Sequence, residues 1–195
     1  MSLLFWLLLV PLGVTGCANA LNMSAGYNGL ESGQIIIISS ALLIISILDK
    51  SDYAISIIYA GIVGSSLALY MFNKYPAKIF VGDVGTLGLG SLIAASVIMG
   101  GHIIYGIICI IPTFYEFFST IKYSLRKVER RGSCMNPVLL DSGLIKPPKG
   151  SEDYTLAFFL LSKFDLSEKS LVNRILSFYV ICSSISLVLF YFFDY

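Results

Sequence analysis

The sequence predicts an all-α polytopic membrane protein with about six transmembrane helices and a loop that carries a small hairpin. Of its 195 residues, 56% are hydrophobic and only 13% are charged, whereas a soluble domain has roughly 25% charged residues. Six apolar runs approach the roughly 20 residues that a helical span requires. The formal net charge of +1 excludes a basic surface for nucleic acid and a highly charged, disordered chain.

Six apolar runs follow one another along the chain. Two of them are short, so the small residues that flank them are expected to enter the bilayer as well. We found no internal repeat, and we therefore expect a single membrane domain over residues 1–195 with a loop over residues 122–174. The runs occupy 3–21, 35–48, 54–72, 86–99, 102–121 and 175–193.

The basic residues predict the orientation of these spans. The loops around residues 22–34, 73–85 and 122–174 lie on one side of a six-span protein. They contain every lysine and arginine except Lys50. The positive-inside rule makes this side cytoplasmic and places both termini outside.

The first polar cluster follows the first apolar run. Asn19 and Asn22 are three residues apart, so their carboxamides face the same side of a helix end. Gly26 and Gly29 permit sharp turns and a close approach of a ligand to the backbone. The alternative is a polar turn between two spans, in which the asparagines cap helices.

The second cluster precedes the fourth apolar run and contains Asp83. A carboxylate here can cap a helix and interact favourably with the helix dipole. It can also bind a hard cation, because Mg²⁺ takes one or two protein carboxylates together with phosphate oxygens and water. The glycines after Asp83 do not form a Walker loop, since no Gly-Lys-Ser/Thr follows them.

The third cluster lies in the loop over residues 122–174. Arg130 and Arg131 are suited to clamp a phosphate, although basic residues are also expected on a cytoplasmic face. Apolar stretches flank residues 141–143, which predicts a hairpin. Asp165 and Glu168 fit a capping-box-like helix start before the last span. His102 lies on the opposite side of the membrane, where we expect a polar helix end and not a catalytic base.

Two of these clusters together resemble a known family. Residues 19–31 read Asn-x-x-Asn-x-x-x-Gly-x-Asn-Gly-Leu-Glu, and residues 73–83 read Asn-x-x-Pro-Ala-Lys-x-Phe-x-Gly-Asp. This combination resembles the polyprenyl-phosphate N-acetylhexosamine-1-phosphate transferases, and the resemblance covers essentially the whole chain. The Asn-Gly-Leu-Glu form is similar to the eukaryotic and archaeal branch, which acts on dolichyl phosphate. Residues 82–86 read Gly-Asp-Val-Gly-Thr, and this form of the motif favours an archaeal source.

The resemblance implies specific roles on the nucleotide side of the site. Asn22 and Asp83 match the residues that hold the catalytic Mg²⁺, for which Mn²⁺ is the alternative. Phe80 matches the aromatic residue that stacks on uracil, and Asn28 matches the residue beside the uracil. Gly26, in the same turn, is assigned to nucleotide binding.

The resemblance also implies roles on the sugar side. Asn19 matches a neighbour of the metal site. Arg131 matches a loop arginine at the pyrophosphate and sugar, and Arg130 falls where the family often has histidine.

The implied activity is the transfer of GlcNAc-1-phosphate, or a related N-acetylhexosamine-1-phosphate, from the UDP-sugar to a polyprenyl or dolichyl phosphate. UMP is released, and the reaction begins the assembly of lipid-linked glycans for N-glycosylation or the cell envelope. The implied setting is an archaeal plasma membrane, or the endoplasmic reticulum in a eukaryote, with a homodimer as the implied assembly.

One departure from the family leaves alternatives open. Family members have about ten spans, and the six expected here correspond to the last six. The adjacent aspartate pair of the first half has no counterpart, because this sequence contains no Asp-Asp. The chain is therefore interpreted as a fragment, as one part of an enzyme that another polypeptide completes, or as an inactive relative. A transporter is less favoured, because the spans contain almost no ionisable residues.

Overall fold

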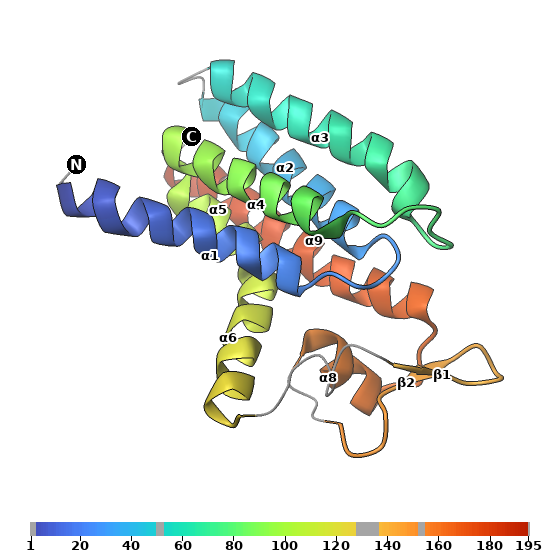
Figure 1. Cartoon of the computed structure of the whole chain (residues 1–195). Coiled ribbons are helices and arrows are strands. Elements are labelled where there is room, and N and C mark those ends of the chain that lie inside the picture. Colours follow the sequence, from blue (N-terminus) through green and yellow to red (C-terminus); the bar gives the residue numbers. More distant parts are fainter. Residues whose placement is uncertain (1–2, 50–52, 128–136, 152–154, 195) are drawn as a thin grey trace.

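The computed structural model describes residues 3–49, 53–127, 137–151 and 155–194, and it is mostly helical (Figure 1). Five helical segments are long and apolar enough to cross a membrane, and a bent helix pair brings the number to six. This confirms the predicted class of an all-α, multi-pass membrane protein. The long segments are η1 (Phe5–Leu9) with α1 (Val10–Met23), α2 (Leu30–Asp49), α3 (Tyr53–Asn73), α4 (Gly82–Met99) and α9 (Glu168–Phe193).

Helix α2 forms the centre of the bundle. In its most apolar stretch 67% of the residues are buried, against 22–28% in the other four long segments. It packs against α3 and α9, while α1 packs along α4 and α5 (Ile103–Cys109) packs against α9. Figure 1 shows this bundle with the beginning of α1 extending beyond it. The exposed faces are rich in large apolar side chains, as lipid contact requires.

The fifth apolar run is not one straight span, which corrects the prediction for residues 102–121. It is divided into α5 and α6 (Ile111–Leu125), which are bent by 70° relative to each other. Pro112 lies in the first turn of α6. Proline is favoured there because it lacks the backbone N–H that an interior helical position needs. Helix α6 consequently leaves the bundle and runs toward α8 (Leu156–Lys163) (Figure 1).

The start of α9 also differs from the capping expectation. The helix begins at Glu168, and Ser167 is its N-cap, whose side chain accepts a hydrogen bond from the Ser170 backbone N–H. Asp165 instead forms an ion pair with Lys146, with 2.8 Å between Oδ1 and Nζ. Glu168 occupies the first turn and accepts hydrogen bonds from Asn28 in the turn between α1 and α2.

The predicted small hairpin is present. Strand β1 (Val138–Leu139) pairs antiparallel with β2 (Ile145–Lys146). Gly143 adopts a φ of 77° in the connecting turn, a conformation that glycine adopts without strain. Ile145 also pairs with Leu166, which connects the hairpin to the segment before α9.

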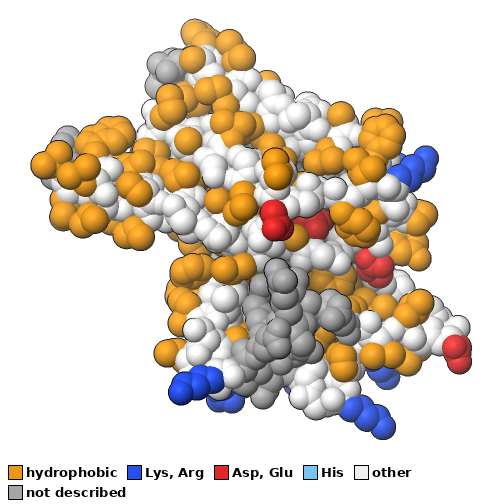
Figure 2. Space-filling model, viewed as in Figure 1, with side chains coloured by type: hydrophobic (Ala, Val, Ile, Leu, Met, Phe, Trp, Pro, Cys, Tyr) orange, Lys and Arg blue, Asp and Glu red, His pale blue; other side chains and the backbone are white. Residues whose placement is uncertain are grey.

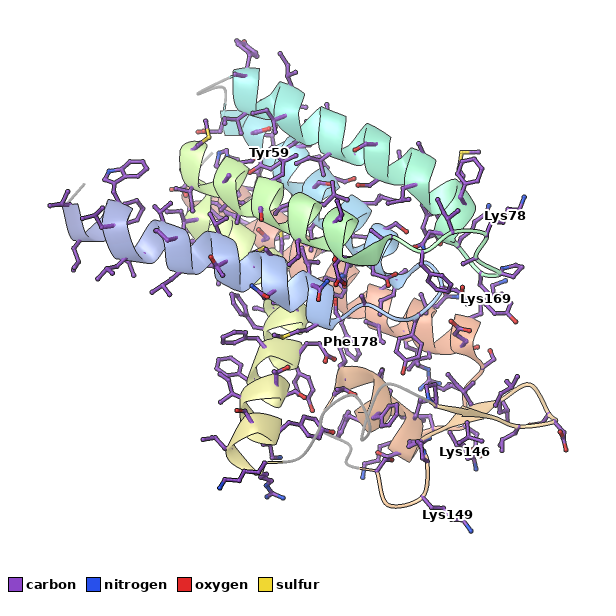
Figure 3. All side chains as sticks on the ribbon, in the orientation of Figure 1. Tyr59, Lys78, Lys146, Lys149, Lys169 and Phe178 are labelled. Atoms are coloured by element: carbon purple, nitrogen blue, oxygen red, sulfur yellow. The ribbon has the colours of Figure 1, made fainter. Side chains whose placement is uncertain are left out.

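Polar side chains gather at one end of the bundle. Figure 3 shows Lys78 and Lys169 at the end where the α1–α2 turn and the α3–α4 loop lie, with Lys146 and Lys149 on the segment beside it. In Figure 2, acidic side chains lie near the ends of α1 and α4, below a surface rich in hydrophobic side chains. The candidate residues that the structure describes lie at this end of the bundle: Asn19, Asn22, Gly26, Asn28, Phe80 and Asp83.

Candidate active site

The centre of the candidate site is a contact between α1 and α4. Asn22, near the end of α1, donates a hydrogen bond from Nδ2 to Asp83 Oδ1 at 2.9 Å, and it also donates to Thr86 Oγ1 at 2.8 Å. Both partners lie in the first turns of α4. The structure thus brings together two residues that the sequence analysis assigned to one site.

The helices can approach closely because of one glycine. A Cβ atom added at Gly90 would lie 2.8 Å from the Ala18 Cα, which is closer than real Cβ contacts allow. Gly90 is buried, and its neighbour across the interface, Ala18, is also small. Small residues at a helix interface allow backbones to approach in a membrane. This contact places the end of α1 beside the start of α4.

Asp83 is exposed, and Asn22 is half-buried. Asp83 is not the helix cap, because α4 has Val81 at its N-cap position without a capping side chain. Within the described residues, no group donates a hydrogen bond to Asp83 Oδ2 or to Asn22 Oδ1. Two hard oxygen acceptors therefore lie on neighbouring side chains at the surface of the site.

The side chains of Asp83 and Asn22 suit Mg²⁺ better than a metal ion whose ligands are all protein side chains. Among the described residues, no three His, Cys, Asp or Glu side chains cluster as metal ligands. Mg²⁺ is commonly bound through one or two carboxylates together with substrate phosphates and several waters. Asn22 faces Asp83 with its amide nitrogen, and the exposed carboxylate with its neighbouring carboxamide suits an ion that arrives with a phosphorylated substrate.

Asn19 lies one turn before Asn22 but has a different environment. Its Nδ2 donates to the Thr15 backbone carbonyl of the same helix at 2.8 Å. The carboxamide is therefore oriented along α1, and among the hydrogen bonds of the described residues Asn22, unlike Asn19, bonds to α4. Within the described residues, Asn19 forms no hydrogen bond with Asp83.

The turn between α1 and α2 is held by buried polar side chains. Gly26 has a φ of 126°, and its backbone N–H donates to Glu31 Oε1 at 2.8 Å. Gln34 donates to Ser24 Oγ at 2.8 Å, which attaches the beginning of the turn to α2. Glu31 and Gln34 are buried, at 3% and 0% exposure. In the sequence, these two buried residues could have been recognised as polar residues at the start of an otherwise apolar run.

Asn28 connects three segments. Its backbone N–H and its Nδ2 both donate to Glu168 Oε1, at 2.8 and 2.7 Å. Its Oδ1 accepts from the Ala77 backbone N–H at 3.2 Å. Both ends of the carboxamide are therefore used within the protein.

The loop between α3 and α4 carries Phe80, whose side chain is 65% exposed. The loop is anchored by Asn73, which is fully buried. Asn73 Oδ1 accepts from Ser32 Oγ at 2.7 Å, and its Nδ2 donates to the Ile79 carbonyl at 3.1 Å. The anchor ends one residue before Phe80, so α2 and α3 together fix the position of the exposed ring.

Below the bundle, α6 and α8 are connected through Glu116. Its Oε1 accepts from the Leu156 backbone N–H at 2.8 Å, and Leu156 is the first residue of α8. Thr155 caps the same helix by accepting from the Phe158 N–H. A small cavity of about 30 Å³ lies beside this contact and reaches Gly26. Sequence reasoning missed Glu116, whose signal was a lone acidic residue in an apolar run.

Two predicted residues cannot be placed. Arg130 and Arg131 lie outside the described residues, so their predicted contact with pyrophosphate and sugar stays a prediction. His102 is described, and its Nε2 lies 3.2 Å from Asp49 Oδ2, at the N-cap of α5. This agrees with a polar helix end away from the Asn22–Asp83 contact.

Comparison with known proteins identifies the family. The model of glycosyl transferase family 4 matches residues 1–101, more than half of the chain. The chain belongs to glycosyl transferase family 4. The matched region contains both sequence motifs and the Asn22–Asp83 contact.

Several curated proteins are similar to this family 4 chain. A Methanocaldococcus jannaschii protein, provisionally named glycosyltransferase MJ1113, is 36% identical over 138 residues, which are 70% of this chain and 44% of that protein. A Saccharolobus solfataricus protein is also 36% identical, over 65% of this chain and 40% of its own length. It is provisionally named UDP-N-acetylglucosamine–dolichyl-phosphate N-acetylglucosaminephosphotransferase.

Bacterial relatives show the same partial coverage. A phospho-N-acetylmuramoyl-pentapeptide-transferase of Halalkalibacterium halodurans is 36% identical over 63% of this chain and 38% of its own length. The family 4 chain thus spans less than half the length of these curated relatives.

Proposed function

We propose that this chain carries the metal and nucleotide site of an enzyme that transfers N-acetylhexosamine 1-phosphate from a UDP-sugar to a polyprenyl phosphate. The observation that carries the proposal is the contact of Asn22 with Asp83. Membership of family 4 supports the reaction class. The Saccharolobus relative's name and the Asn-Gly-Leu-Glu motif favour GlcNAc as the sugar and a dolichyl phosphate as the acceptor.

Asp83 and Asn22 would hold a divalent cation, Mg²⁺ or alternatively Mn²⁺. Both offer oxygen atoms, and Asp83 Oδ2 accepts no hydrogen bond from the described residues. Such an ion supplies neutralisation of the charge on the pyrophosphate and on the UMP that leaves. The Thr86 hydroxyl keeps the Asn22 carboxamide oriented, because it accepts from the opposite end of that group.

Other residues would bind and orient the nucleotide and the sugar. The exposed ring of Phe80 is suited to stack on uracil, an interaction worth about 1–3 kcal/mol per base. Gly26 has no side chain to obstruct the approach of a ligand. Arg131, with Arg130 beside it, is the proposed contact to the pyrophosphate and the sugar.

The reaction requires mainly positioning and charge stabilisation. An oxygen of the lipid phosphate attacks the β-phosphorus of the UDP-sugar, and the bond from that phosphorus to UMP breaks. The products are lipid-diphosphate-sugar and UMP. Asp83 lies in the first turn of a helix able to span the membrane, so a site there can receive a lipid phosphate and a water-soluble nucleotide. We propose that this face is cytoplasmic.

A transfer assay tests the proposal. The purified chain is given Mg²⁺, radiolabelled UDP-GlcNAc and a polyprenyl phosphate, alone and after co-expression with the first four spans of a relative. We expect Mg²⁺-dependent lipid-linked product in at least one of the two preparations. Asp83→Ala should reduce the rate by more than about 100-fold, since metal ions supply several kcal/mol of charge stabilisation.

Asp141→Ala serves as the control, because Asp141 is exposed in the hairpin turn and has no proposed part in the reaction. It should retain the rate of the unmodified chain. Equal rates for Asp83→Ala and Asp141→Ala would refute the metal assignment. The absence of product in both preparations would refute the proposed function.

A further inference from the structure

The first turn of α9 reaches the nucleotide side of the site through one carboxylate. Glu168 Oε1 accepts two hydrogen bonds from a single residue, the Asn28 backbone N–H at 2.8 Å and the Asn28 Nδ2 at 2.7 Å. Glu168 and Asn28 are 140 residues apart. The distances are typical of charge-assisted hydrogen bonds, which are the stronger ones in proteins.

Asn28 also forms a hydrogen bond with a second loop. Its Oδ1 accepts from the Ala77 backbone N–H at 3.2 Å, and Ala77 lies three residues before Phe80. One side chain therefore joins the first turn of α9, the turn that contains Gly26, and the loop that contains Phe80. The two loops proposed to border the nucleotide are thus connected through Asn28, and Asn28 is oriented by Glu168.

A second carboxylate acts on the same turn. Glu31, in the first turn of α2, accepts from the Gly26 backbone N–H at 2.8 Å. Glu31 and Glu168 therefore hold backbone N–H groups that are two residues apart. Each carboxylate lies in the first turn of its own helix, where the helix dipole favours negative charge.

We propose that Glu168 is a positioning residue that sets the geometry of the uridine side of the site through Asn28. This inference rests on the proposed function. It assigns Asn28 a structural role between the loops, since its carboxamide is already engaged at both ends. Recognition of the base then depends on the exposed Phe80 ring and on the geometry of the turn at Gly26.

The packing of α9 does not by itself require this carboxylate. Leu171, Val172 and Ile175 of α9 are buried, at 0%, 5% and 4% exposure, and they provide an apolar contact independent of Glu168. Glu168 itself is only half-buried. Its loss should therefore leave α9 in place and release the two loops.

Hydrogen–deuterium exchange and nucleotide binding test the proposal on the purified chain. Glu168→Ala should increase exchange in peptides covering residues 24–30 and 74–80, and it should weaken UDP-GlcNAc and UMP binding about tenfold, which corresponds to one charge-assisted hydrogen-bond pair. Glu168→Gln keeps a carbonyl oxygen at Oε1 and should restore most of both properties. In the transfer assay, Glu168→Ala should raise KM and leave kcat within about twofold.

Asp165→Asn is the matched control, because Asp165 is exposed and pairs only with Lys146 among the contacts described. It should change neither exchange at these loops nor nucleotide binding. Unchanged exchange in Glu168→Ala would overturn the positioning role, whatever the nucleotide result. If the unmodified chain binds no uridine nucleotide while Glu168→Ala still releases the loops, the connection between the loops stands and the proposed function fails.

Discussion

Asn22 Nδ2 lies 2.9 Å from Asp83 Oδ1, although 61 residues separate them in the chain. The two side chains belong to different helices, and they meet because α1 and α4 pack closely near Gly90. An exposed carboxylate thereby acquires a neighbouring carboxamide at the end of two membrane-spanning segments.

The α1–α4 approach should be sensitive to the size of residue 90. In Gly90→Ala the new Cβ would lie 2.8 Å from the Ala18 Cα, so the helices must separate. Overpacking of this kind costs about 1–3 kcal/mol. We expect a lower Tm and a large loss of transfer. Gly88→Ala, where a Cβ would meet nothing within 4 Å, should match the unmodified chain, and equal effects of the two variants would contradict the account.

The Phe80 ring should contribute to binding and little to stability. It is 65% exposed, so Phe80→Ala removes few packing contacts. Without the ring that stacks on uracil, the Kd for UDP-GlcNAc should rise by about ten- to hundredfold, as measured by isothermal titration calorimetry. Phe118→Ala, at an equally exposed residue of α6, provides the control. A Kd that is unaffected by Phe80→Ala would eliminate the stacking role.

The anchor of the Phe80 loop should depend on one buried hydroxyl. Ser32→Ala removes the donor that lies 2.7 Å from Asn73 Oδ1 and leaves a buried acceptor without that partner. Such a change costs about 1–3 kcal/mol. A reduced Tm and weaker nucleotide binding should appear together. Ser65→Ala, at an exposed serine that bonds its own helix, should be neutral; if it destabilises as much as Ser32→Ala, the anchor is not specific.

Glu116 should hold α8 against α6. Glu116→Ala removes the acceptor of the Leu156 N–H at the start of α8. We expect faster hydrogen–deuterium exchange and faster proteolysis over residues 155–163, with no change in α2. Thr155→Ala removes the cap of the same helix and should produce a weaker effect in the same region, because caps contribute about 1 kcal/mol. Unaltered protection of α8 in Glu116→Ala would contradict this role.

The sequence predicted the spans well because lipid imposes long apolar runs on each helix. The run over residues 102–121 was the exception. Its hydropathy is continuous, yet a new helix begins at Ile111, with Pro112 in its first turn, and the chain turns by 70°. The proline was visible in the sequence, but hydropathy alone does not distinguish a straight span from a broken one.

The candidate site was predictable only in part. Asn22 and Asp83 were assigned to one metal site through a resemblance of motifs; the structure shows a hydrogen bond between them, and the metal role stays a prediction. The contact between Asn28 and Glu168 was not predicted, because a pairing across 140 residues depends on how α9 packs against α2. Glu168 was interpreted as part of a helix cap, which is a local role. Local patterns gave its position in the helix and not its distant partner.

The most direct test of the Asn22–Asp83 site is the Mg²⁺ dependence of UDP-GlcNAc binding, measured by calorimetry on the purified chain and on Asp83→Ala and Asn22→Ala. We predict that Mg²⁺ tightens binding to the unmodified chain by at least about tenfold. This gain should disappear in Asp83→Ala and be strongly reduced in Asn22→Ala, while Asp141→Ala retains it. An identical gain from Mg²⁺ in the unmodified chain and in Asp83→Ala would contradict the account.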